Sequence, residues 1–215
     1  MNAFQRLLAV GSGSLLLGAS ATASLIFDLG TTINGSTPTG TPPFLRAEFQ
    51  TLGTDSVRLT LTNLMPTTNF VDNWVFNIDP LSGLVFTYES GVAAIDVSSG
   101  LNFTDGGSNV KAGLFDIMFH YDTSEANRFH GGLTSVYTIT GAGIDENSFL
   151  AFSIDNPSSP PSPGGWLSAS HVQGFANGAG SGSIGTMTPV PEPATIAVIG
   201  LSAVAMIRRR LGRKR

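Results

Sequence analysis

The chain has 215 residues, of which 41% are hydrophobic and 12% are charged, and it contains no cysteine. Such a chain is too apolar to be disordered, its length fits one domain or two small ones, and the missing cysteine excludes disulfides, thiolate nucleophiles and cysteine-bound zinc. Residues 24–190 include four basic and fourteen acidic residues, and this net charge of −10 argues against nucleic acid or anionic lipid as a partner.

The first 23 residues have the organisation of a signal peptide. Arg6 gives a weakly positive start, residues 7–18 are mostly apolar, and Ala21-Thr22-Ala23 has the small-x-small form of a signal-peptidase site. A buried first strand or helix is the alternative interpretation. We expect signal peptidase to remove residues 1–23, so that the mature chain begins at Ser24 outside the cytoplasm.

Residues 24–173 are predicted to form one all-β ectodomain. Apolar and polar side chains alternate along short runs separated by turn-forming residues, as at residues 57–64, 73–80, 114–121, 135–141 and 148–155. The pattern predicts about nine or ten antiparallel strands and no amphipathic helix before residue 190. We expect an antiparallel β-sandwich, for which a jelly roll is one option.

The two tryptophans bear on where a ligand could bind. Trp74 alternates with the apolar Phe76 and Ile78, so it is predicted to lie in the core. Trp166 follows the sequence PPSPGG, where an exposed indole could stack on a sugar ring. The favoured interpretation is that Trp166 folds back over the end of the sandwich.

One group of residues is a candidate for a divalent-metal site. Imidazole and carboxylate groups can bind such an ion, and four of them fall within eleven residues: His120, Asp122, Glu125 and His130. Their spacing matches no established zinc signature, and loop residues of this kind are ordinarily solvated. We therefore expect no metal and no cofactor. Nothing in the sequence selects a pair of carboxylates for glycoside hydrolysis.

Residues 174–188 read GFANGAGSGSIGTMT and are predicted to form a flexible, glycine-rich stem. They contain a formal G-x-G-x-x-G at Gly180, Gly182 and Gly185. A dinucleotide site would need a helix directly after these glycines, and the sequence Thr-Met-Thr-Pro follows instead.

The tail, residues 189–215, has three parts. A Pro-Glu-Pro triplet precedes an uncharged run of 14 residues and a basic cluster: Pro191, Glu192 and Pro193, then 194–207, then a cluster that includes Arg208, Arg209 and Arg210. A helix of about 20 residues spans a bilayer core, but arginine stems can snorkel to the headgroups and lengthen a short span. We predict a transmembrane helix over 194–207, stopped on the cytoplasmic side by the arginines. The alternative, a nucleic-acid-binding tail, conflicts with the signal peptide.

These residues give the tail a specific resemblance. It resembles the PEP-CTERM sorting signal of Gram-negative bacteria, in which Val-Pro-Glu-Pro precedes a short transmembrane helix and an arginine-rich end. The resemblance implies an exported bacterial surface protein that is a substrate of exosortase, a membrane transpeptidase thought to cut near the triplet. Pro191, Glu192 and Pro193 would then be recognised by exosortase and would not be catalytic.

The expected function is a structural or adhesive role at the cell surface or within exopolysaccharide, after anchoring in the inner membrane. The alternative is a carbohydrate-binding β-sandwich module, with a glycosidase third, and we expect that the protein is not an enzyme. Exposed aromatic side chains would favour the binding module, whereas convergent carboxylates in a cleft would favour the enzyme. The expected partners are signal peptidase, exosortase, the membrane and extracellular polysaccharide.

Overall fold

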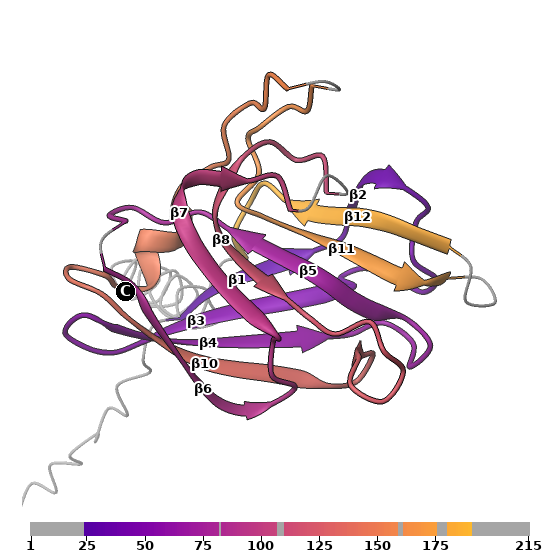
Figure 1. Cartoon of the computed structure of the whole chain (residues 1–215), viewed down its shortest axis with the longest axis horizontal. Helices are drawn as coiled ribbons and strands as arrows, with labels where there is room; N and C mark the ends of the chain where they lie inside the picture. Colours follow the sequence, from indigo (N-terminus) through magenta and orange to yellow (C-terminus); the bar gives the residue numbers. More distant parts are fainter. Residues whose placement is uncertain (1–23, 82, 107–109, 159–160, 176–179, 191–215) are drawn as a thin grey trace, which may run out of the picture.

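The computed structural model describes residues 24–81, 83–106, 110–158, 161–175 and 180–190. Within these ranges the chain forms two β-sheets that share one core, and all the strand pairs are antiparallel (Figure 1). The predicted all-β, antiparallel fold is therefore confirmed. The finer assignment to a jelly roll remains a prediction.

The first sheet has the strand order β1-β3-β4-β10-β6. Its strands, in that order, are Ser24–Leu29, Leu45–Gly53, Ser56–Asn63, Thr134–Thr140 and Val85–Gly91. The second sheet has the order β2-β12-β11-β5-β8-β7, and the short strand β9 also pairs with β5. Its strands are Thr31–Gly35, Gly180–Thr186, Ser168–Gly174, Phe70–Phe76, Phe115–His120, Asp96–Thr104 and, for β9, Phe129–His130.

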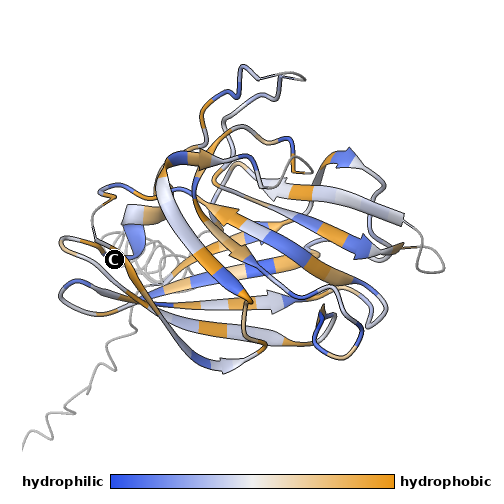
Figure 2. Cartoon of the chain, viewed as in Figure 1, coloured by the Kyte–Doolittle hydropathy of each residue, from blue (hydrophilic) through white to orange (hydrophobic). Residues whose placement is uncertain are grey.

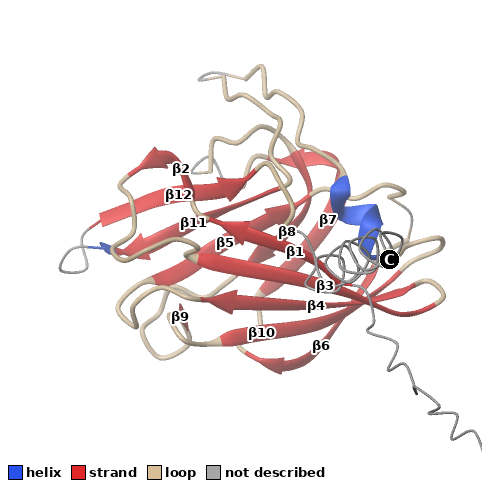
Figure 3. Ribbon diagram, turned by 180° about the vertical axis from the view of Figure 1, so that it is seen from behind, coloured by secondary structure: helices blue, strands red, loops and turns tan. Residues whose placement is uncertain are grey.

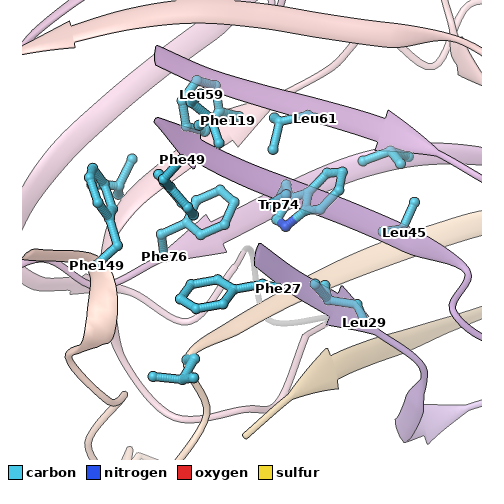
Figure 4. Close-up of a cluster of buried hydrophobic side chains, with 14 of the residues drawn as sticks. Phe27, Leu29, Leu45, Phe49, Leu59, Leu61, Trp74, Phe76, Phe119 and Phe149 are labelled. Atoms are coloured by element: carbon cyan, nitrogen blue, oxygen red, sulfur yellow. The ribbon is translucent and has the colours of Figure 1, made fainter. Parts of the chain in front are cut away.

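The core between the sheets is rich in aromatic side chains (Figure 4). Phe49 of the first sheet packs edge to face against Phe76 of the second, with ring centroids 5.4 Å apart. Trp74 is fully buried, as predicted, and its Nε1 donates to Ser168 Oγ at 2.9 Å. The alternation of apolar and polar residues along the strands is visible in Figure 2. On β4 this alternation buries Val57, Leu59 and Leu61 completely.

A second, smaller apolar cluster covers part of the outer face of the second sheet. Trp166 lies there against Val75, Phe115 and Ala169, and only 7% of its surface is exposed. Trp166 therefore folds back over the sandwich, as the favoured interpretation held. This burial also removes the exposed indole that sequence reasoning had offered as a surface for sugar binding.

Residues 148–155 are not a strand, although their alternation predicted one. Glu146–Leu150 form a 3-10 helix, η1, at the side of the sheets (Figure 3). The Asp145 carboxylate caps it by accepting hydrogen bonds from the N–H groups of Asn147 and Ser148, at 2.9 and 3.1 Å. Such a cap satisfies the free donors of a first helical turn and so outweighs the strand pattern.

The predicted flexible stem is wrong for residues 180–186, which form strand β12 between β2 and β11. The glycines of this segment permit close packing. A Cβ atom added to Gly182 would lie 2.1 Å from the carbonyl oxygen of Ser36, and one added to Gly185 would lie 2.8 Å from both Trp166 and Ile33. The sandwich therefore extends past residue 173, where the sequence had placed its end.

The remaining predictions for the two ends concern residues that the structure does not describe. The signal peptide (1–23), the Pro191-Glu192-Pro193 triplet, the helix over 194–207 and the arginine cluster all lie outside the described ranges. Within those ranges, none of the helices has the length and apolar character needed to cross a membrane.

Candidate functional site

The four weak candidates for metal binding do not form one site. Among the residues that the structure describes, no group of three or more histidine and acidic side chains is arranged to hold a metal ion. The Asp122 carboxylate accepts hydrogen bonds from Ser124 N at 2.8 Å and from Asn127 Nδ2 at 3.1 Å. The bond from the Ser124 backbone contributes most to lowering the pKa of Asp122. Nε2 of His130 lies 3.3 Å from the backbone oxygen of Glu125. These contacts shape the loop between β8 and β9.

His120 points to a different partner, the buried carboxylate of Asp72. Nε2 of His120 lies 3.7 Å from Asp72 Oδ1, and Nδ1 of His171 lies 2.9 Å from Asp72 Oδ2. Gln173 also donates to Oδ2 through Nε2, at 3.1 Å. Asp72 lies where the pairing of β5 with β11 shifts between His171 and Val172, so a β-bulge places its side chain among these groups.

The Asp72–His171 contact was missed by sequence reasoning, because nothing in the spacing of residues on separate strands indicates it. A carboxylate that orients an imidazole is also an element of general-base catalysis. Here both residues are buried, with 8% and 7% of their surfaces exposed. Hydrogen bonds to Asp72 therefore join β5 to β11, and His120 of β8 lies near the same carboxylate.

A solvent-open groove lies at the edge of the sandwich where β6 and β7 meet. It consists of two adjoining clefts, of about 480 and 540 Å³, which share Ala93, Ala94 and Ile95 of the β6–β7 connection. We call the two clefts together the edge groove. Each lies within the roughly 300–1,000 Å³ that is usual for small-molecule sites. One cleft has polar side chains in its lining and the other has aromatic ones: Asp122, Asn127, Arg128 and His130 in the first, and Phe86, Tyr88 and Tyr137 in the second.

Tyr88 is the exposed aromatic residue of the edge groove, with 46% of its surface accessible. Its ring meets the ring of Tyr137 at an angle of 66°, with centroids 5.7 Å apart. Its hydroxyl donates to the backbone oxygen of Gly91 at 2.7 Å. The ring is thus held at its polar tip, while nearly half of the surface of Tyr88 stays exposed to solvent.

The β6–β7 connection, residues 92–95, is itself held by side chains from the core. The Tyr137 hydroxyl accepts a hydrogen bond from Ala94 N at 2.7 Å, and the Ser135 hydroxyl donates to Val92 O at 2.6 Å. Tyr121, which is fully buried, donates to Ser135 in turn, at 3.0 Å. Burial raises the pKa of both tyrosines, so their hydroxyls stay neutral at physiological pH. This wall of the edge groove is therefore preorganised.

The C-terminal end of the described chain is attached to the edge of the first sheet opposite β6. Val190 N donates to Ile26 O of β1 at 2.8 Å, and the two residues form an antiparallel bridge. Ser24, where the mature chain is expected to begin, is the first residue of the same strand. The two ends of the described fold therefore meet on β1.

The comparison with known protein families bears on the residues that follow this junction. A family model described as the PEP-CTERM protein-sorting motif matches residues 189–214. Comparisons with curated proteins and with solved structures give no match. The motif indicates an exported protein that is anchored in the membrane and then processed by exosortase. The chain is thus a protein with a PEP-CTERM sorting domain, which follows the β-sheets that the structure describes.

Proposed function

We propose that the β-sandwich has a structural or adhesive role, displayed on the cell surface or in exopolysaccharide after exosortase has processed the tail, and that it is not an enzyme. The observation that carries this proposal is the match of the sorting motif to residues 189–214, directly after a compact β-fold.

The use of buried acids supports a non-catalytic role. The described carboxylates that are most buried are Asp72 and Asp116. Asp116 accepts hydrogen bonds from the backbone N–H groups of Ile78 and Asn102, at 3.2 and 2.7 Å. Asp72 accepts from His171 and Gln173. Both carboxylates therefore connect strands and loops, whereas a glycosidase needs a pair of carboxyl groups facing a shared cleft.

A carbohydrate-binding module is the second candidate, and the edge groove is the observation that favours it. Trp166 no longer supports this function because it is buried. Tyr88 supplies the exposed aromatic surface instead, beside a cleft lined by hydrogen-bonding groups. A glycosidase comes third. The structural role and the binding role are compatible, since a domain can adhere to a polymer by binding it.

Fractionation of cells with and without exosortase tests the surface role. We expect full-length precursor in the inner membrane of cells that lack exosortase, and shorter, released or surface-bound protein in cells that have it. Deletion of the gene should weaken cell adhesion or the cohesion of the extracellular matrix. Protein that stays in the cytoplasm, or a matrix that is unchanged by the deletion, would contradict the proposal.

A further inference from the structure

We infer that the edge groove is a binding site for a neutral polysaccharide, with the ring of Tyr88 as the surface on which a sugar ring stacks. The inference rests on the proposed surface role, and it assigns to that role a site and a class of ligand.

The chemistry of the groove fits a ligand that is apolar on its faces and polar around its rim, as a pyranose ring is. Tyr88 offers an exposed ring whose position is fixed by its hydroxyl bond to Gly91 and by its contact with Tyr137. The adjoining cleft offers hydrogen-bonding side chains, Asn127 and His130 among them. A fixed wall lowers the entropy lost on binding, and residues 92–95 form such a wall.

The charges at the groove favour a neutral polymer. Two acids, Asp96 and Asp122, line it together with one guanidinium, that of Arg128. Arg128 already donates to Thr123 O at 2.7 Å and lies 4.2 Å from the centre of the Phe70 ring. An anionic polysaccharide would therefore be repelled by two carboxylates and attracted by only one lining guanidinium, that of Arg128, which already contacts Thr123 and Phe70.

The position of the groove suits display away from the membrane. The chain leaves the described fold toward the sorting motif at Val190, which is bonded to β1. β1 is one edge strand of the first sheet and β6 is the other. Four strand spacings separate them, which is roughly 19 Å. The groove is thus on the side of the first sheet opposite the attachment of the tail.

A second copy of the protein is the main competing occupant. Ile95 borders the groove and is 60% exposed, so the same edge has apolar surface that another copy could cover. A sugar is favoured because the groove combines a fixed, exposed aromatic ring with polar side chains in the adjoining cleft. Self-association is therefore measured alongside polysaccharide binding.

The test uses the full chain, purified in detergent micelles, and affinity electrophoresis in native gels. The gels contain one of three neutral polymers, dextran, laminarin or galactomannan, or the anionic polymer alginate. We expect retardation by at least one neutral polymer and none by alginate. Tyr88→Ala should weaken binding by roughly tenfold or more, because it removes the stacking surface. Tyr88→Phe keeps the ring and should bind within about threefold of the parent.

Phe152→Ala is the matched control. Phe152 is an exposed aromatic residue, 54% accessible, that does not line the groove, so its removal should leave binding unchanged. Circular dichroism checks that each variant is folded.

Three results would overturn the inference: no retardation by any neutral polymer, equal binding by Tyr88→Ala and the parent, or retardation by alginate alone. If the parent sediments as a dimer and Tyr88→Ala sediments as a monomer, the groove is a self-association surface and the inference is overturned. A protein that fractionates as proposed but binds none of the neutral polymers would refute this site and leave the surface role standing.

Discussion

Val190 donates its backbone N–H to the carbonyl oxygen of Ile26, at 2.8 Å, and this bond ties the end of the sandwich to its first strand. Pro191, the first residue of the sorting triplet, follows Val190 directly. Among the residues that the structure describes, the attachment is a single antiparallel bridge. The triplet that is predicted to be recognised by exosortase therefore begins one residue after a backbone bond to β1, whereas the sequence predicts a flexible stem before it.

Insertion of a six-residue Gly-Ser spacer between Val190 and Pro191 tests the importance of this short connection. The spacer leaves the triplet intact and moves it away from β1, so we expect processing to be at least as fast as in the parent. The melting temperature of the protein should fall little, since at most the one backbone hydrogen bond of Val190 is affected, and such a bond contributes about 0.5–1.5 kcal/mol. Pulse-chase immunoblotting measures the rate of processing. A spacer variant that is not processed would mean that the folded domain is itself part of the recognised surface.

Gly182→Ala distinguishes a strand from a stem at residues 180–186. A Cβ atom at this position would collide with backbone, the Ser36 oxygen at 2.1 Å, so β2 and β12 would have to move apart. We expect a loss of about 1–3 kcal/mol in the free energy of unfolding, as for overpacked cores. Gly53→Ala is the control, because nothing lies within 4 Å of a Cβ atom there. Thermal unfolding followed by circular dichroism compares the two, and equal melting temperatures would support a stem instead.

An element can be predicted from the sequence when its own residues determine it, and it is missed when residues distant in the sequence do. β4 was predictable because Val57, Leu59 and Leu61 show the two-residue period of a half-buried strand. β12 was missed because glycine, which supplies three of its seven residues, is depleted in strands. Its place is fixed by neighbours distant in sequence, such as Ser36 and Trp166.

The same reasoning applies to the candidate sites. The Asp72–His171 pair joins residues 99 positions apart, and its geometry depends on a bulge that no local pattern indicates. Tyr88 belongs to an edge strand whose residues are mostly exposed, so alternation did not mark it as part of a site. The sorting motif was predictable because recognition by another enzyme depends on the order of residues in a short segment.

Alkaline pH should destabilise the protein through its buried tyrosines. Burial raises the pKa of Tyr121 and of Tyr137 above the ordinary value, so the native state keeps protons that the unfolded state loses. The pKa of a tyrosine in the unfolded chain is about 10. The stabilisation that the two buried tyrosines contribute is fully present below that pH and is lost as the pH rises through their raised pKa values in the folded protein. We expect the melting temperature to fall above about pH 10. Tyr121→Phe should make the fall shallower. A melting temperature of the parent that is constant up to pH 12, well above that unfolded pKa, would contradict this account.

The arginine cluster should control membrane retention without affecting the folded domain. Replacement of Arg208, Arg209 and Arg210 with glutamine removes the positive charge next to the uncharged run, so the short helix should slip through the membrane or lose its orientation. We expect less protein in the membrane fraction and an unchanged melting temperature. Replacement of Arg213, Lys214 and Arg215 removes the same charge further from the run and should have a smaller effect. Equal retention by both variants would argue against a stop signal at 208–210.

We expect exosortase to act on this protein through Pro191, Glu192 and Pro193. The most direct measurement is an immunoblot of membrane, surface and released fractions from cells that express either the parent or the triple alanine variant. The parent in a strain without exosortase shows the unprocessed form. We expect the alanine variant to match that form, to stay in the membrane and to melt at the same temperature as the parent. Processing and release of the alanine variant at the parent's level would contradict it, and the tail would then act only as a short membrane anchor.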